Sequence, residues 1–148
     1  MDLGQTQFLA KAVAAATEAH HVWPKMAACE AALESAWGKS ALAIQANNLF
    51  GMKAHENATN VIEIPTREWV DTVGWQTFPA KWMKYTSWLA CFDDRMATLE
   101  LLEHAFPDYG RALDAVSAQE YIFYVSKSWS TDPDRAAKVL RIYLEAYS

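Results

Sequence analysis

Residues 31–54 read AALESAWGKSALAIQANNLFGMKA, and this stretch decides the fold. Pro24, a short distance upstream, suits the first turn of a helix, and Gly38 suits its end. The sequence therefore predicts a helix over about 24–37. Ser40 then caps a second, shorter helical piece. The stretch thus joins the end of one helix to the start of another.

The residues that follow this stretch change in character. Residues 61–71 and 75–82 are rich in Val, Ile, Thr and Trp, and the three residues Thr-Val-Gly lie between them. Partial alternation with period two predicts a twisted β-hairpin, inserted over about 61–84. Pro65 and Pro79 mark edges or bulges, so we expect a small appendage rather than a central sheet.

Helices are predicted on both sides of the hairpin. Residues 5–19 are alanine-rich and carry an apolar face. Beyond Ser87, apolar residues recur at steps of three and four, which indicates a long helix. A capping box at 117–120 and the Thr-Asp-Pro at 131–133 open two more helices, the last running to about 147. The predicted fold class is mainly α (α+β), with one hairpin near the middle.

Composition restricts the classes of function. The 148 residues suit a single domain over 1–148, and 52% apolar with 21% charged residues is typical of a globular protein. A net charge of −5 without a basic stripe argues against nucleic-acid binding. No run approaches the roughly 18 apolar residues of a membrane span, and the first residues lack a secretory-signal pattern.

The cysteines and tryptophans carry weaker signals. Cys29 and Cys91 both lie in segments that look helical, and we expect two buried thiols rather than a disulfide. No metal or cofactor is implied. Seven tryptophans are many for this length. Most should fill the core, and one or two should line a groove, where an indole stacks on the C–H face of a sugar.

Glu34 is the acidic residue with the clearest chemical potential. It lies at the end of a helix, near the negative pole of the helix dipole, among Ala31, Leu33 and Trp37. Both surroundings favour the protonated carboxyl and raise its pKa, which suits a general acid for a glycosidic bond. The alternative is an ordinary surface glutamate on the polar side of the helix, one turn after Glu30.

Three motifs give the chain a family resemblance. They are LESAWG at 33–38 with NLFGMK at 48–53, AKWMKYTS at 80–87, and STDP at 130–133 with Lys138. In this order and spacing they resemble glycoside hydrolase family 73, the bacterial and phage β-N-acetylglucosaminidases that include the hydrolase domain of flagellar-rod assembly proteins. The usual Glu-Ser-Gly-Trp-Gly has Ala36 here, and Met83 replaces a usual arginine.

The resemblance implies a lysozyme-like fold, with a substrate groove between a helical lobe and a hairpin lobe. It places the catalytic acid at Glu34. A second carboxylate maps onto the hairpin at Glu68, with Thr66 two residues earlier and therefore on the same side of the strand. Glu68 would activate water or stabilise the oxocarbenium ion. The alternatives are Glu63, Asp71, or the 2-acetamido group of the substrate itself.

The resemblance also nominates residues that contact the substrate. Trp129 stands where many family members have a tyrosine before Thr-Asp-Pro, and an indole stacks on a sugar but supplies no phenolic hydroxyl. Arg135 stands where an aromatic residue is common. Phe50 is either part of the groove wall or a hinge between the lobes. Tyr85 is a structural residue or a ligand-binding one.

The sequence therefore predicts a peptidoglycan hydrolase, an endo-β-N-acetylglucosaminidase that acts as a monomer on glycan strands in the periplasm or cell wall. The rival interpretations are a muramidase or lytic transglycosylase on the same fold, and a wall-binding module with a decayed active site. Without a visible signal, export would use a holin or a specialised secretion system. The second route would imply a cognate immunity protein.

Overall fold

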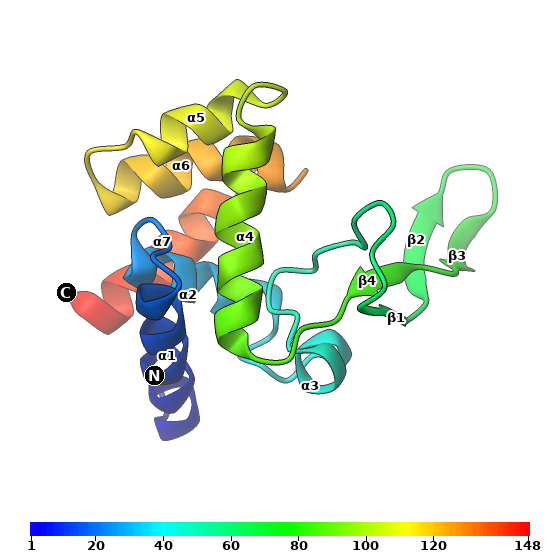
Figure 1. Cartoon of the computed structure of the whole chain (residues 1–148), viewed down its shortest axis with the longest axis horizontal. Helices are drawn as coiled ribbons and strands as arrows, with labels where there is room; N and C mark the ends of the chain where they lie inside the picture. Colours follow the sequence, from blue (N-terminus) through cyan, green and yellow to red (C-terminus); the bar gives the residue numbers. More distant parts are fainter.

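The computed structural model describes residues 1–148, and a mainly helical body carries a long β-hairpin at one end (Figure 1). The hairpin lies at the end of the molecule opposite the carboxyl terminus. The elements in chain order are α1 (Leu3–Glu18), α2 (Pro24–Glu34), α3 (Ala41–Ala46), β1 (Val61–Glu63), β2 (Thr66–Val70), β3 (Gly74–Phe78), β4 (Lys81–Met83), α4 (Trp88–Leu102), α5 (Pro107–Leu113), α6 (Ala118–Trp129) and α7 (Arg135–Tyr147).

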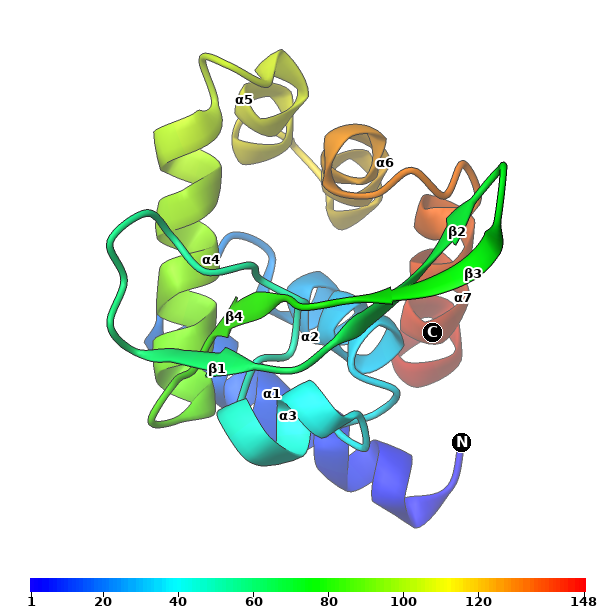
Figure 2. The same ribbon diagram turned by 90° about the vertical axis from the view of Figure 1, so that its right-hand side faces the viewer.

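The core lies among α1, α2, α4, α6 and α7, around the alanine-rich helix α2 (Figure 2). Every residue of α2 from Met26 to Ala32 is buried. Five of these seven residues are alanine or cysteine, and small side chains let α1 and α7 approach α2 closely. Leu49, Phe92, Leu99 and Val139 fill the spaces between the helices. The central helix therefore offers a rigid base for the residue at its end, Glu34.

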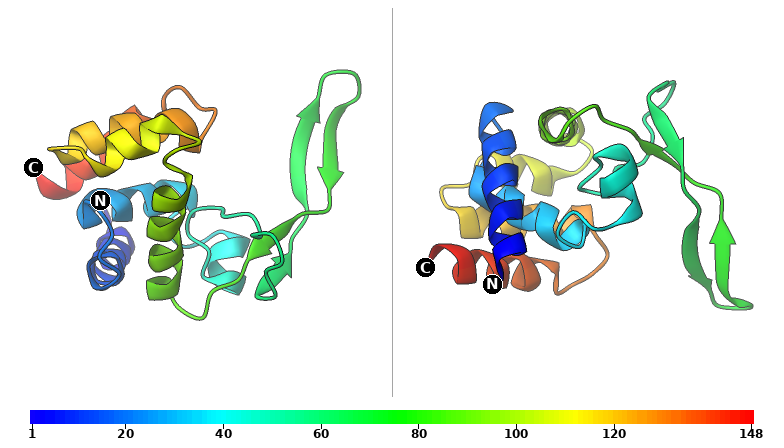
Figure 3. Two further views of the ribbon diagram at one scale, coloured as in Figure 1. Left: turned by 45° about the horizontal axis from the view of Figure 1, so that its top comes forward. Right: turned by 90° about the horizontal axis from the view of Figure 1, so that it is seen from below.

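The hairpin is divided into two short ladders. β1 pairs with β4, and β2 pairs with β3, both antiparallel. Pro65 and Pro79 fall in the breaks between the ladders, which confirms that they interrupt the strands. The inner ladder is tied to the body by the bridge between Lys53 and Trp82. The outer ladder stands clear of the body (Figure 3).

The expected end of the central helix was wrong by three residues. Helix α2 stops at Glu34 rather than near Trp37. Ser35 follows it as the cap residue, and its hydroxyl donates to the Ala31 carbonyl (2.6 Å) and accepts from the Gly38 N–H (2.9 Å). Ala36 and Trp37 then both adopt positive φ, at 50° and 58°. Glu34 is therefore the last helical residue, followed at once by a tight turn.

The helix caps on the carboxyl-terminal side follow the sequence in part. Ser117 caps α6 through its hydroxyl, as expected, and Ser87 caps α4 in the same way. Helix α7, in contrast, begins at Arg135, two residues after the expected Pro133. Asp132 accepts from the Asp134 N–H and from Lys138 instead of capping the helix at its first residue. The loop before α7 is therefore longer than predicted, and Arg135 occupies the first turn.

Two further expectations concern the core and the membrane. Cys29 and Cys91 are free, buried thiols, which confirms the preferred alternative, and burial raises the pKa of each to about 12. None of the helices is both long and apolar enough to cross a bilayer.

The turn after Glu34 makes Ala36 a strained position. A left-handed conformation costs an L-residue roughly 1–2 kcal/mol, whereas glycine adopts it freely. We expect Ala36→Gly, the residue the resemblance calls for, to raise the free energy of unfolding by about 1 kcal/mol and Tm by roughly 2–4 °C. Thermal denaturation measures this. Ala10→Gly on the exposed side of α1 is the matched control, and it should lower stability. A destabilised Ala36→Gly would contradict the account.

Candidate active site

An open groove of roughly 570 Å³ runs over the carboxyl end of α2. Its walls come from six parts of the chain: Glu34, the loop residues Phe50–Lys53 with His55, Trp82 of β4, Thr98 and Leu102 of α4, Tyr109 of α5, and Trp129–Thr131 at the end of α6. Glu34 and Trp129 therefore meet in one groove, as the sequence predicted. Trp82 is a second tryptophan in the lining, in line with the expectation that one or two would face a groove.

Glu34 is held by a single ion pair. Arg135 donates from Nε to Glu34 Oε1 at 2.9 Å, and the Glu34 side chain is 27% exposed. Glu34 Oε2 accepts no hydrogen bond from the protein and is free to face a ligand. The sequence-based expectation of a poorly solvated carboxyl is met only in part. Some water contact remains, and the guanidinium of Arg135 contacts one of the two carboxylate oxygens.

Beneath Glu34 lies a buried charged cluster of three residues, Glu30, Arg95 and Arg135. Arg95 contacts both carboxylate oxygens of Glu30, at 3.1 and 2.7 Å, and Arg135 reaches Glu30 Oε2 at 2.7 Å. Tyr121 donates its hydroxyl to Glu30 Oε1. Burial alone would raise the pKa of Glu30, but the charges of Arg95 and Arg135 outweigh it and lower the pKa to about 2. Glu30 is thus a buried carboxylate, not the surface neighbour of Glu34 that the alternative interpretation assumed.

The cluster also supports the aromatic wall of the groove. The guanidinium of Arg95 lies 4.4 Å from the ring centre of Phe50 and 4.2 Å from that of Trp129. The two rings meet edge to face at 6.2 Å. A cation between two aromatic faces fixes both rings. Phe50, which is 2% exposed, belongs to this wall, and the proposed sugar-stacking face of Trp129 is rigidly supported.

His21 completes the surroundings of Arg95. Its Nδ1 donates to the Val22 carbonyl at 2.7 Å, so the neutral tautomer presents Nε2 to Arg95 Nη1, 3.4 Å away. Burial, reinforced by the charge of Arg95, lowers the pKa of His21 to about 4. An unfolded histidine has a pKa near 6.5 and binds a proton first on acidification. Folding therefore loses stability as the pH falls from 6.5 towards 4.

We expect the wild type to lose about 2 kcal/mol of unfolding free energy between pH 7 and pH 5 because of His21. His21→Gln offers a donor and an acceptor without titrating, so it should remove most of this loss. Urea denaturation at the two pH values measures it. Glu30 has a pKa of about 2, so its own effect on the unfolding free energy appears below pH 5. His104→Gln, an exposed histidine, is the control. An unchanged pH dependence in His21→Gln would contradict the assignment.

The hairpin residues are placed apart from the groove. Glu68 pairs across the ladder with Gln76, and Thr66 pairs with Phe78. Neither Glu68 nor Thr66 lines the groove that holds Glu34. Glu68 is exposed on the outer ladder. The structure therefore does not bring the two candidate carboxylates together in this state.

Tyr85 takes a structural position. It is 6% exposed, and its hydroxyl contacts Asp94 Oδ2 at 2.5 Å and the sulfur of Met52 at 3.3 Å. Burial, with the hydrogen bond to Asp94, raises its pKa. Asp94 also holds His55, 2.8 Å from its Oδ2, at the groove edge. Tyr85 is thus not among the groove-lining residues, and it supports the wall from behind.

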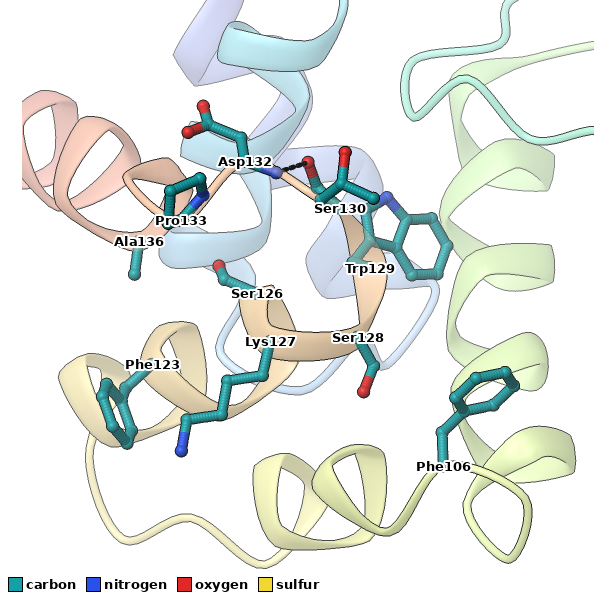
Figure 4. A pocket seen from close by; sticks show the side chains of 11 residues that line it. Phe106, Phe123, Ser126, Lys127, Ser128, Trp129, Ser130, Asp132, Pro133 and Ala136 are labelled. Atoms are coloured by element: carbon teal, nitrogen blue, oxygen red, sulfur yellow. Dashed lines mark hydrogen bonds between the residues drawn. The ribbon is translucent and has the colours of Figure 1, made fainter.

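A larger hollow of roughly 870 Å³ adjoins the groove on the far side of Trp129 (Figure 4). The indole of Trp129 points towards α4, whereas Phe123 and Lys127 lie on the other side of the hollow. Residues Trp129–Thr131 line both hollows. A third hollow shares His55, Thr98 and Leu102 with the groove. Glu34 therefore lies in the middle one of three adjoining depressions.

A helical body, a hairpin lobe and a groove with one available carboxyl define a lysozyme-like glycoside hydrolase domain. The glucosaminidase family, described as mannosyl-glycoprotein endo-β-N-acetylglucosaminidase, matches residues 10–148, and the chain belongs to it. A curated relative, the exo-glucosaminidase LytG of Bacillus subtilis, is 35% identical over 128 residues, or 84% of this chain. The match covers 44% of LytG, less than half of its length.

Solved structures confirm the predicted fold. The catalytic domain of the autolysin Auto from Listeria monocytogenes matches with a TM-score of 0.83 at 23% identity, over 99% of this chain and 86% of that one. A truncated glycoside hydrolase domain of FlgJ from Salmonella typhimurium gives 0.73 at 28% identity, over 97% and 99%. The mainly α, lysozyme-like fold with a hairpin lobe is therefore established.

Proposed function

We propose that the chain is a peptidoglycan hydrolase that cleaves the β-1,4 bond after N-acetylglucosamine, with Glu34 as the general acid. One observation carries the proposal: Glu34 lines the groove with Oε1 tied to Arg135 and Oε2 free of protein partners. A carboxyl anchored by one oxygen can deliver a proton from the other to the glycosidic oxygen. Membership of the glucosaminidase family and the wall of Phe50 and Trp129 support a sugar substrate.

We propose an endo mode of cleavage. The depressions on both sides of the groove share residues with it, so a glycan chain has places to lie in both directions from Glu34. An exo mode would need one end of the groove to be closed. Size-exclusion chromatography of early products from purified sacculi tests this. Long oligosaccharides should precede small ones, and release of short units from the start would assign an exo mode.

The group on the other face of the sugar is the second element of the mechanism. Glu68 reaches the groove only if the outer ladder moves towards it, whereas the 2-acetamido group arrives with the substrate. We propose Glu68 as the assisting carboxylate in a closed state. Glu68→Gln should then lose roughly 10²-fold in kcat. Glu100→Gln, at an exposed position on α4, is the control, and Glu63→Gln and Asp71→Asn test the two alternative carboxylates of the hairpin. Activity within threefold of wild type in all three hairpin variants would assign the role to the acetamido group.

Zymography tests whether the domain is active at all. A gel containing purified sacculi should clear around the wild-type band. A stable, folded protein that clears nothing, and that releases no saccharide in solution, would mark a wall-binding module with a decayed site. The measurement is independent of the identity of the second group.

The setting follows from the substrate. A peptidoglycan hydrolase acts at the cell wall, and we propose that this one works there as a monomer. We propose export by a holin or by a specialised secretion system, and the second route would bring a cognate immunity protein. Light scattering of the purified chain tests the monomer, since a dimer at micromolar concentration would contradict it.

A further inference from the structure

We propose that Arg135 is a positioning residue that confines the catalytic proton to Glu34 Oε2 and, together with Glu30, sets the pH at which that proton is lost. The inference rests on the proposed role of Glu34 and adds a determinant outside the motifs that identify the family. Arg135 occupies a place where the resemblance leads one to expect an aromatic residue.

Three contacts hold the guanidinium of Arg135 in one orientation. Its Nε contacts Glu34 Oε1 at 2.9 Å, Nη2 contacts Glu30 Oε2 at 2.7 Å, and Nη1 contacts Ser126 Oγ at 2.9 Å. The side chain is 1% exposed. Because all three nitrogens are engaged in one plane, the guanidinium cannot swing away without breaking buried bonds.

An oxygen that accepts a charged hydrogen bond is a poor site for a proton. Protonation of Glu34 Oε1 would weaken its bond to Arg135, while Oε2 has no protein partner to lose. The acidic proton therefore resides on Oε2, the oxygen free for the substrate. Fixing the reacting atom in this way contributes to rate through orientation.

The contact between Arg135 and Glu34 also opposes protonation of Glu34, and the nearby carboxylate of Glu30 weakens this opposition. Arg135 alone would stabilise the Glu34 carboxylate strongly, because opposite charges in contact favour ionisation. Its charge is shared with Glu30, which also binds Arg95, so two guanidiniums face two carboxylates. The negative charge of Glu30 therefore offsets part of the positive potential that Arg135 places at Glu34.

Other titratable groups surround the pair. Those on neighbouring elements are Glu30 on α2, Arg95 on α4, Tyr109 on α5, Tyr121 on α6, His21 before α2 and Asp132 before α7. Across the groove lie Lys53 and His55. Only Arg135 contacts Glu34 directly. Substitutions of Arg135, or of its partner Glu30, should therefore shift the titration of Glu34 more than substitutions of the other groups.

The proposal predicts opposite effects for two substitutions. Arg135→Gln removes the cation and should move the alkaline limb of kcat/KM to higher pH by about one unit. Glu30→Gln leaves the two guanidiniums unbalanced and should move the limb to lower pH. Arg135→Lys keeps the positive charge but not the planar guanidinium with its three contacts. The alkaline limb of kcat/KM should therefore stay in place in this variant, while kcat falls roughly tenfold. Arg141→Gln, which removes an exposed charge from the same helix, is the matched control.

A carbon-13 NMR titration of the Glu34 carboxyl in the protein without substrate gives the same answer independently of activity. Its midpoint should rise in Arg135→Gln and stay unchanged in Arg141→Gln. If Arg135→Gln folds and both its midpoint and its limb equal those of wild type, Arg135 is merely structural and the proposal fails. If Glu30→Gln does not fold, Arg135→Gln still decides, because Glu30 keeps Arg95. A wild type that titrates as expected but cleaves no peptidoglycan would instead refute the proposed function.

Discussion

Glu34→Gln should lose about 10³-fold or more of wild-type kcat on purified peptidoglycan. Glutamine keeps the shape of the side chain and an amide oxygen for Arg135, so the groove and its wall should remain intact. It cannot supply a proton to the glycosidic oxygen. KM should change little, because Glu34 acts on the leaving group and the sugar contacts lie elsewhere in the groove.

The control for this substitution is Glu18→Gln. Glu18 is exposed at the end of α1 and lines neither the groove nor the two adjoining depressions, so it makes the same chemical exchange away from the substrate path. It should retain near wild-type activity. Circular dichroism and Tm establish that both variants fold. A folded Glu34→Gln that keeps more than a tenth of wild-type kcat would contradict the assignment of Glu34 as the acid.

Glu30→Ala should be the most destabilising single substitution in the site. Glu30 is fully buried and is the shared anion of Arg95 and Arg135. Without it, both buried guanidiniums lose their principal partner, and breaking a buried ion pair from one side costs about 3–5 kcal/mol. Arg95 already has one buried nitrogen, Nε, without a partner, so it has little capacity to compensate.

Urea denaturation at pH 7 measures this loss. Glu100→Ala, an exposed glutamate on α4, should change the unfolding free energy by less than about 0.5 kcal/mol. A triple substitution of Glu30, Arg95 and Arg135 by apolar residues should recover part of the lost stability, because no unpaired charge remains. A Glu30→Ala variant as stable as the control would show that the cluster contributes nothing to folding.

Local signals predicted much of the fold. Pro24 and Ser87 mark helix starts, and Pro65 and Pro79 mark the breaks in the hairpin, because each acts on its own backbone. The end of α2 was misplaced because Ala36 and Trp37 adopt left-handed backbone conformations, which apolar periodicity does not reveal. Helix α5 (Pro107–Leu113) was not foreseen, since its seven residues are too few to show a period.

The catalytic acid was accessible from the sequence, but its surroundings were not. Glu34 stands in a recognisable motif, whereas its partner Arg135 lies 101 residues away, and no local pattern joins them. Arg95 offered a weak signal: it falls on the apolar stripe of α4, between Phe92 and Leu99, where a buried charge requires a partner. The matching signal was Glu30, a carboxylate on a helix whose other buried residues are mostly alanine.

The chemical identity of the new reducing end tests the central claim most directly. Sacculi digested by the wild type are reduced with borohydride, and the products are analysed by mass spectrometry. A glucosaminidase leaves N-acetylglucosamine at each new reducing end, so reduced N-acetylglucosamine should appear there and should be absent after incubation with Glu34→Gln. Reduced N-acetylmuramic acid at every new end would contradict the account and identify a muramidase. Anhydro-N-acetylmuramic acid, which borohydride does not reduce, would contradict it and identify a lytic transglycosylase.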